Sequence, residues 1–332
     1  MDRQLSLMLM LTLSMVISLP GIADKLLNWQ DESLLVQSEN QLYLVDPVQT
    51  SVHTFATLAA GIEIIATQHN TLIAFDNAGH LLVLVSSLER PGSFDEKQRI
   101  PIGDETEIVS VLSSGERLVI LIANSIGEAF SLGVPIFTII TLQPDGSITS
   151  LEDNFERQPR FFILYQSKNQ VTLFDEVTET LLTFDLETGS QLPVLPLLPF
   201  PKARDELHSL AIGAQGQQVV SLRRHDQNGD LVSNELRLLE PDAQKYSYIA
   251  SHSANEGLIE NIAWRPDGSG FLYELNEGGK TKVYLATLQE NSWVHKFVTV
   301  APDPVRYVWL TKQLAILTAE DQLSIFNFSR PQ

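Results

Sequence analysis

After position 24, the order of hydrophobic and polar residues is typical of β-strands and shows little helical periodicity. Short runs that are apolar, or that alternate apolar with polar residues, recur between turn-forming residues. The predicted strands begin with Ser33–Gln37, Gln41–Val45, Val52–Leu58, Ile62–Thr67, Thr71–Phe75 and His80–Val85, and end with Arg306–Thr311, Leu314–Thr318 and Gln322–Phe328. The pattern therefore predicts an all-β fold.

The segments between these strands have the chemistry of tight hairpin turns. Each contains Gly, Asn or Asp, the residues that accept a positive φ most easily. Examples are Asp76–Gly79, Pro144–Gly146, Asn228–Asp230, Pro266–Gly268 and Glu277–Gly279. Because strands joined in this way pair antiparallel, we expect consecutive strands to form meanders.

The strand sets repeat along the chain. Apolar residues from the leading strand of each set lie 44 to 53 residues apart, at Ile64, Ile108, Phe161, Leu210, Ile262 and Tyr307. A four-stranded propeller blade takes roughly 40–50 residues. A single β-propeller of seven blades is therefore predicted, with six or eight blades as alternatives and a β-sandwich as the competing architecture. We expect a strand near Leu26–Trp29 to complete the last set and close the ring.

The first residues are typical of a secretory signal peptide. A short polar start with Arg3 precedes the apolar run Leu5–Leu19, and Gly21 and Ala23 are small residues suited to cleavage. This run of 15 is short for a membrane span, although an uncleaved N-terminal anchor is the alternative. We therefore expect a signal peptide at 1–23, a propeller domain at 24–332, and a periplasmic or secreted location without stable membrane insertion after cleavage.

Composition narrows the chemistry further. The chain has no cysteine, which excludes a lipoprotein, thiol catalysis and zinc–thiolate or iron–sulfur sites. Its net charge of −19 disfavours nucleic acid as a partner. The basic cluster Arg223–His225 is flanked by Asp226 and Asp230, which is typical of a solvated hairpin end.

One segment carries a more specific repeat. Ile262 to Leu285 contains an apolar strand that ends in Trp264, a turn with Pro266, Asp267 and Gly268, another apolar strand and a Val-Tyr-Leu strand. This segment resembles the repeat of TolB-type propellers, a WD-repeat-like group, although Arg265 stands where that repeat has Ser. The resemblance implies a propeller fold and gives the motif residues a structural role. We expect Trp264, Trp309 and Trp29 to pack between blades.

Catalytic and metal-binding patterns are weak. Gly268-Ser269-Gly270 lies in a hairpin turn, not in a nucleophile elbow, and no histidine belongs to a ligand pair. A calcium site at Asp226, Asn228 and Asp230 is the one local metal hypothesis. It departs from a calcium loop because Leu231 and Arg237 stand where Gly and Glu belong.

These observations favour a non-catalytic propeller that serves as a protein-interaction or scaffold module in the cell envelope or extracellular space. Two alternatives stay open: a hydrolase or lactonase with a metal in the central channel, and a binder of small ligands or glycans. The segments Glu89–Thr106 and Leu195–Glu206 are predicted to be long loops, either binding surfaces or variable insertions.

Overall fold

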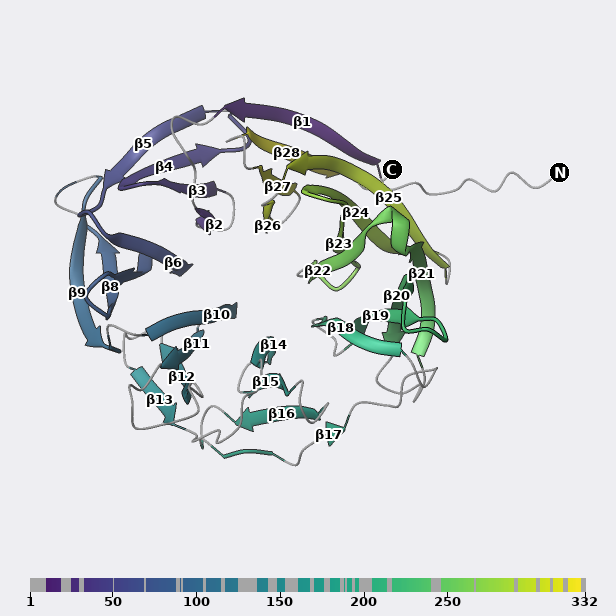
Figure 1. The fold of residues 1–332 in the computed structure, drawn as a ribbon. Helices are drawn as coiled ribbons and strands as arrows, with labels where there is room; N and C mark the ends of the chain where they lie inside the picture. Colours follow the sequence, from purple (N-terminus) through teal and green to yellow (C-terminus); the bar gives the residue numbers. More distant parts are fainter. Residues whose placement is uncertain are drawn as a thin grey trace.

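The protein forms a ring of seven four-stranded antiparallel sheets in a computed structural model (Figure 1). The structure describes residues 10–18, 25–29, 33–49, 51–68, 70–87, 90, 92–103, 106–114, 117–124, 136–142, 148–152, 161–167, 170–175, 180–185, 188, 190–192, 195–196, 205–213, 217–239, 246–265, 267–289, 292–302, 305–310, 313–318 and 322–329. The predicted all-β propeller of seven blades is thus confirmed. Within these ranges, no helix has the length and apolar character needed to cross a membrane.

Each sheet is one blade, and the blades follow chain order. Blade 1 contains β2 (Lys25–Trp29), β3 (Ser33–Ser38), β4 (Gln41–Asp46) and β5 (Ser51–Thr57). Blade 2 contains β6 (Ile62–Gln68), β7 (Thr71–Asp76), β8 (His80–Ser86) and β9 (Phe94–Pro101). Blade 3 contains β10 (Thr106–Ser114), β11 (Arg117–Asn124), β12 (Ile136–Leu142) and β13 (Ile148–Glu152). Blade 4 contains β14 (Phe161–Ser167), β15 (Gln170–Asp175), β16 (Thr180–Asp185) and β17 (Leu195–Pro196).

The second half of the ring has the same plan. Blade 5 contains β18 (Asp205–Ile212), β19 (Gln218–His225), β20 (Leu231–Leu239) and β21 (Tyr246–Ser253), followed by the short 3-10 helix η1 (Ala254–Glu256). Blade 6 contains β22 (Leu258–Trp264), β23 (Gly270–Asn276), β24 (Lys280–Gln289) and β25 (Ser292–Pro302). Blade 7 contains β26 (Arg306–Trp309), β27 (Gln313–Leu317), β28 (Gln322–Ser329) and, from the other end of the chain, β1 (Met10–Ser18). In every blade the first strand after the connection lies nearest the centre of the ring (Figure 1).

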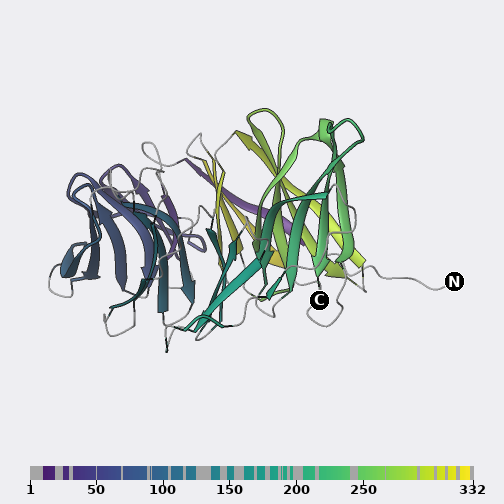
Figure 2. The same ribbon diagram turned by 60° about the horizontal axis from the view of Figure 1, so that its bottom comes forward.

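The ring closes in a different way from the one expected. Lys25–Trp29 is the inner strand of blade 1, and the fourth strand of blade 7 is β1, which pairs antiparallel with β28. The prediction that Leu26–Trp29 closes the ring is therefore wrong. The reason is that β2 pairs with β3, from Lys25↔Gln37 to Trp29↔Ser33, and is therefore part of blade 1. Figure 2 shows β1 in purple running among the yellow-green strands of the last blades.

The two predicted long loops also contain strands. β9, the outer strand of blade 2, takes up Phe94–Pro101 in the middle of Glu89–Thr106, so the prediction of one long loop is wrong there. In Leu195–Glu206, the structure has β17 at one end and the start of β18 at the other, and 197–204 lies outside the described residues. The sequence did not predict β9 because most of its residues are polar, as an outer strand that remains solvated on much of its surface allows.

The hydrophobic core lies between neighbouring blades. Leu34 and Val36 of blade 1 pack in one cluster with Leu323 and Ile325 of blade 7. The opposite side of blade 1 packs against Ile64, Leu72 and Leu82 of blade 2. Fully burying one such aliphatic side chain contributes about 1.5–3 kcal/mol, so these interfaces hold the blades in the ring.

A β-bulge recurs at one position of the inner strands. In β6, β10, β14, β18 and β22, pairing with the second strand skips the fourth residue of the inner strand. The skipped residues are Ile65, Val109, Leu164, His208 and Asn261. A bulge bends its strand and increases the local twist, which suits strands that converge around an axis. Asn261 has φ 29°, a left-handed value that Asn tolerates better than most residues.

Candidate functional site

The calcium hypothesis falls on the turn between β19 and β20. Asp226 Oδ1 accepts backbone N–H groups from Asn228 at 2.7 Å and from Asp230 at 3.0 Å. These hydrogen bonds, that of Asp230 first, hold the pKa of Asp226 below its ordinary value. Asp226 is thus already used to close the turn, and calcium binding there stays a prediction.

A similar use of aspartate recurs in blade 2. Asp76 Oδ1 accepts N–H groups from Ala78 and His80, and Arg99 Nη1 lies 2.7 Å from Asp76 Oδ2. Burial acts to raise the pKa of Asp76, but hydrogen bonds from His80 outweigh it and the pKa is lowered. Across the described part of the chain, no three His, Asp or Glu side chains gather in a way that could hold a metal ion.

Blade 5 contains a group of mutually paired charges. Arg224 Nε donates to Asp205 Oδ1 at 3.2 Å, and the Arg224 guanidinium also pairs with Glu235. Arg237 Nη2 lies 2.5 Å from the other oxygen of Glu235. Two guanidinium groups therefore meet two carboxylates, so these four charges compensate one another inside the blade and have a structural role.

The TolB-like motif lies in blade 6, at the end of its inner strand. Trp264 Nε1 donates to Ala211 O of blade 5 at 3.2 Å, and a Cβ on Gly213 would approach the Trp264 ring to 2.9 Å. Gly268 has φ 70°, and Asp267 Oδ1 accepts the N–H of Ser269 at 3.0 Å. Pro266 lies outside the described residues. Trp264 thus packs between blades, while Asp267 and Gly268 shape the turn.

Trp29 and Trp309, the other two tryptophans expected to pack between blades, also lie at blade interfaces. Trp29 is buried and packs edge-on against Phe94 of blade 2, with ring centroids 6.3 Å apart. Trp309 of blade 7 lies under the guanidinium of Arg265 from blade 6, at 5.8 Å.

A chain of polar aromatic side chains joins the outer strands of blades 5 and 6. His252 Nε2 lies 3.1 Å from the hydroxyl of Tyr273, which lies 3.3 Å from His295 Nδ1. Burial lowers the pKa of both histidines and raises the pKa of the Tyr273 hydroxyl. The cluster therefore favours neutral imidazole rings, which can both donate and accept hydrogen bonds.

Aromatic packing continues from this cluster to the surface. Tyr273 stacks on Tyr284 with centroids 5.2 Å apart and an interplanar angle of 10°. Tyr284 meets Phe297 edge-on at 5.8 Å, and half of the Phe297 side chain is exposed. A rigid core therefore supports an exposed aromatic ring on β25.

Phe297 belongs to an exposed apolar group on the two outer strands of blade 6. We define the β25 surface as Leu288, Phe297 and Val300, whose exposed fractions are 52%, 50% and 51%. Their pairing positions in β24 and β25 put them on the same face of the sheet as Tyr284, whereas Val294 pairs with Thr287 and lies on the other face. Only three other large hydrophobic residues are equally exposed among the described residues: Val48, Val232 and Tyr248. Concentrated apolar exposure of this kind is typical of an interaction site.

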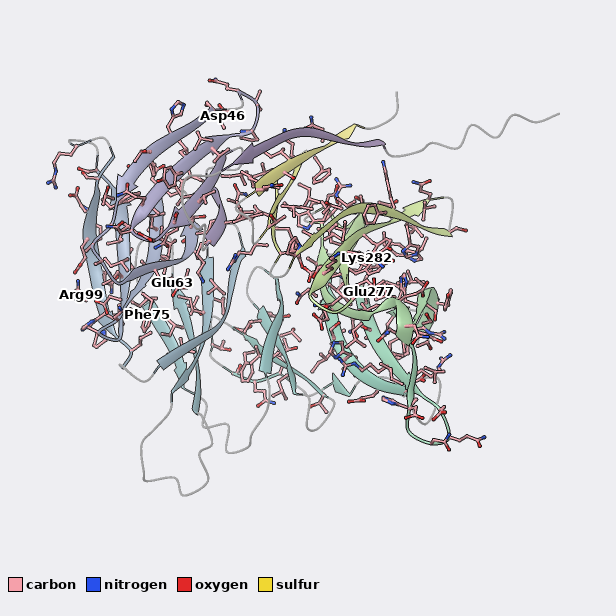
Figure 3. The ribbon with its side chains drawn as sticks, turned by 45° about the horizontal axis from the view of Figure 1, so that its top comes forward. Asp46, Glu63, Phe75, Arg99, Glu277 and Lys282 are labelled. Atoms are coloured by element: carbon pink, nitrogen blue, oxygen red, sulfur yellow. The ribbon has the colours of Figure 1, made fainter. Side chains whose placement is uncertain are left out.

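The two strands that carry the β25 surface contain basic but no acidic residues. β24 and β25 contain Lys280, Lys282 and Lys296 and no acidic residue, although the chain has a net charge of −19. Lys282 Nζ pairs with Glu277 Oε2 at 2.6 Å, at the end of the blade (Figure 3). The surface therefore combines apolar side chains with lysines.

The turn motif in the sequence pointed to blade 6, but no sequence pattern predicted the β25 surface. The apolar residues of Ser292–Pro302 read as an ordinary buried strand, because residues on both faces are apolar. Only the position of β25 at the outer edge of its sheet shows that several of them remain exposed. The run of large apolar residues with lysine but without acidic residues was the available signal.

Comparison with known proteins supports the fold. No protein-family model matches the chain, and no curated protein matches its sequence. An oligogalacturonate lyase in complex with manganese is similar in structure, with a TM-score of 0.63 and 11% identity over 95% of this chain and 91% of that chain. A chain of a mitotic checkpoint complex has a TM-score of 0.59 and 10% identity over 98% and 95%.

A third structure is described in its own name as a propeller. The Myceliophteria thermophila Cps50 (Swd1) β-propeller domain has a TM-score of 0.53 and 8% identity, covering 96% of this chain and all of that domain. At such low identities, structural similarity shows the fold and leaves the activity open. The comparisons and the seven sheets together establish an all-β propeller.

Proposed function

We propose that this chain is an exported, non-catalytic β-propeller that binds a partner protein through the β25 surface. The observation that carries the proposal is the exposure of Leu288, Phe297 and Val300 on one face of two adjacent outer strands. An exposed aromatic residue held by a rigid core is a typical anchor of a protein interface. The edge-on contact of Phe297 with Tyr284 also reduces the side-chain ordering needed on binding.

The lysines of blade 6 define the partner more closely. With Lys280 and Lys282 on the same face as the apolar group, a complementary surface is apolar at its centre and acidic at its rim. The acidic remainder of the propeller repels such a partner, which favours binding at this blade.

Export and family membership are parts of the same proposal. The apolar N-terminal run and its small-residue cleavage site support export to the periplasm or the extracellular space. The TolB-type relationship rests on the Ile262–Leu285 repeat, with Trp264 at the end of its first strand.

Photo-crosslinking in the native envelope tests the proposed surface. A photo-reactive amino acid at Leu288 should give defined crosslinked products, and a Phe297→Ser/Val300→Ser variant should lose them. Exposed substitutions change stability by about 0.5 kcal/mol or less, so each variant should unfold near the Tm of the parent. Val48→Ser is the matched control, because Val48 is 77% exposed in blade 1, away from β25. Products that persist in the double variant, or that disappear equally in Val48→Ser, contradict the proposal.

A further inference from the structure

β28 has a hydrogen-bonded neighbour on each side, β27 and β1. Its pairing with β1 runs from Met10↔Ser329 to Ser18↔Gln322 and so covers the whole length of β28. The strand sequence, QLSIFNFS, contains no charged residue, and Leu323 and Ile325 are fully buried. These are the properties of a strand in the interior of a sheet.

Most outer strands of the other blades are protected as edges. The pairing of β5, β9, β21 and β25 with their neighbours contains a bulge in each case, and β17 is two residues long. β13 of blade 3 has no bulge, but it is only five residues long and ends in Glu152. β9 also carries Asp95, Glu96, Lys97 and Arg99. Bulges, charges and short length are devices that prevent another strand from pairing with an edge. The pairing of β28 with β1 also has a bulge, but the extra residue, Ser14, belongs to β1. β28 itself pairs with β27 without a register shift, carries no charge and is eight residues long.

The strand that covers β28 lies inside the predicted signal peptide. Met10–Ser18 is part of the apolar run Leu5–Leu19, and cleavage after Ala23 removes it. Such cleavage would uncover an uncharged edge of eight residues. An edge of this kind is a template for another strand.

We propose that β28 of the exported protein is an acceptor edge, on which an extended segment of a partner protein pairs antiparallel in the place of β1. This inference rests on the proposed export and cleavage, and it adds a second contact to the proposed interaction module. The fitting segment is uncharged and about eight residues long, and it alternates apolar with small polar residues, as the β1 sequence MLTLSMVIS does in part. Main-chain hydrogen bonds provide the affinity in strand addition, and side-chain pockets provide the specificity.

The direction of the peptide groups shows which hydrogen bonds a bound segment makes. Thr318 N donates to Gln322 O, so the backbone N–H and C=O groups of Gln322 point toward β27. These groups point to alternate sides at successive residues, so those of Leu323 and Ile325 point toward the edge where β1 pairs. Their partners in β1 are Ile17 and Met15, whose N–H groups therefore point toward β28.

The test uses the processed protein purified after export of the full chain, with its N-terminus determined by intact mass. The probe is a synthetic peptide of residues 10–18. One form is N-methylated at Met15 and Ile17, where methylation blocks hydrogen bonds to β28. The matched control is N-methylated at Val16 and Ser18, whose N–H groups face away. Binding is measured by calorimetry and by the shift in Tm.

We expect the unmodified peptide and the control to bind and to raise the Tm, and the blocked peptide to bind on the order of tenfold more weakly or worse, because two hydrogen bonds are lost. A purified protein that retains residues 1–23 overturns the acceptor edge and the proposed cleavage together, while the β25 surface stands. A processed protein that ignores all three peptides overturns the acceptor edge alone. The processed protein could instead form a dimer that the peptide converts to monomers. That result assigns the edge to a second copy of this chain and overturns the proposal of a different partner protein.

Discussion

At the scale of single residues, polar side chains join neighbouring blades where the strands themselves do not pair. Gln37 of β3 reaches into blade 2, where its Oε1 accepts the N–H of Ile64 and its Nε2 donates to Ile62 O, both at 2.8 Å. Asn234 Nδ2 of blade 5 donates to Gly257 O, just before blade 6, also at 2.8 Å. Each side chain satisfies a main-chain group at a blade interface.

The role of Gln37 leads to a stability prediction. In a Gln37→Leu variant, the N–H of Ile64 and the carbonyl of Ile62 lose their side-chain partner, and Ile64 is fully buried. An unsatisfied buried polar group costs about 1–3 kcal/mol, so we expect the free energy of unfolding to fall by about 2 kcal/mol. Urea denaturation measures the change. Gln41→Leu is the control, because Gln41 bonds the Thr57 hydroxyl at the surface, and an equal loss there contradicts the proposed role of Gln37.

At the scale of elements, the sequence predicted the apolar strands and missed polar ones. The apolar pattern predicts strands at Ile259–Trp264, Gly270–Leu275, Lys282–Thr287 and His295–Val300, which match β22 to β25 of blade 6 to within three residues at each end. The match is best for β23, which is buried along almost its entire length. β21, with the sequence YSYIASHS, was missed, since an outer strand needs few apolar residues. The bulges were also invisible, because skipped residues as different as Ile65 and Asn261 share no side-chain chemistry.

The contact between β21 and blade 6 should depend on pH. Burial lowers the pKa of His252 and His295 in the folded protein, although Glu256 acts against it at His252 and a backbone hydrogen bond with Ile249 acts against it at His295. Between these lowered values and about 6.5, the unfolded chain binds more protons than the folded protein. The free energy of unfolding should therefore fall as the pH drops below about 6.5, and the slope should vanish below the folded pKa values.

A His252→Gln/His295→Gln variant separates these two residues from the other titrating groups. Denaturation at a series of pH values from 7 to 5 should show a smaller slope in the variant than in the parent protein. His208 remains, and its pKa is also lowered by burial, so the slope should be reduced but not abolished. An unchanged slope shows that the two histidines do not limit the acid stability of this contact.

At the scale of the whole molecule, the propeller brings residues from distant parts of the chain to one central axis, so sequence spacing alone cannot test a shared metal site. We expect the purified exported protein to contain no stoichiometric calcium, zinc or manganese, because Asp226, the first residue of the calcium hypothesis, already accepts two backbone N–H groups. Elemental mass spectrometry without added chelator measures the metal content. One equivalent of bound metal favours the propeller hydrolase over the interaction module.

The bulge at the fourth residue of five consecutive inner strands has a consequence for comparing the blades. Side chains at equivalent positions differ so much that the blades cannot be aligned residue by residue, yet Ile65, Val109, Leu164, His208 and Asn261 mark one common point. Residues of these five inner strands can therefore be numbered relative to the skipped residue, which gives equivalent positions in different blades the same number. Divergence of repeats can thus be traced through backbone geometry after the sequences themselves have ceased to resemble one another.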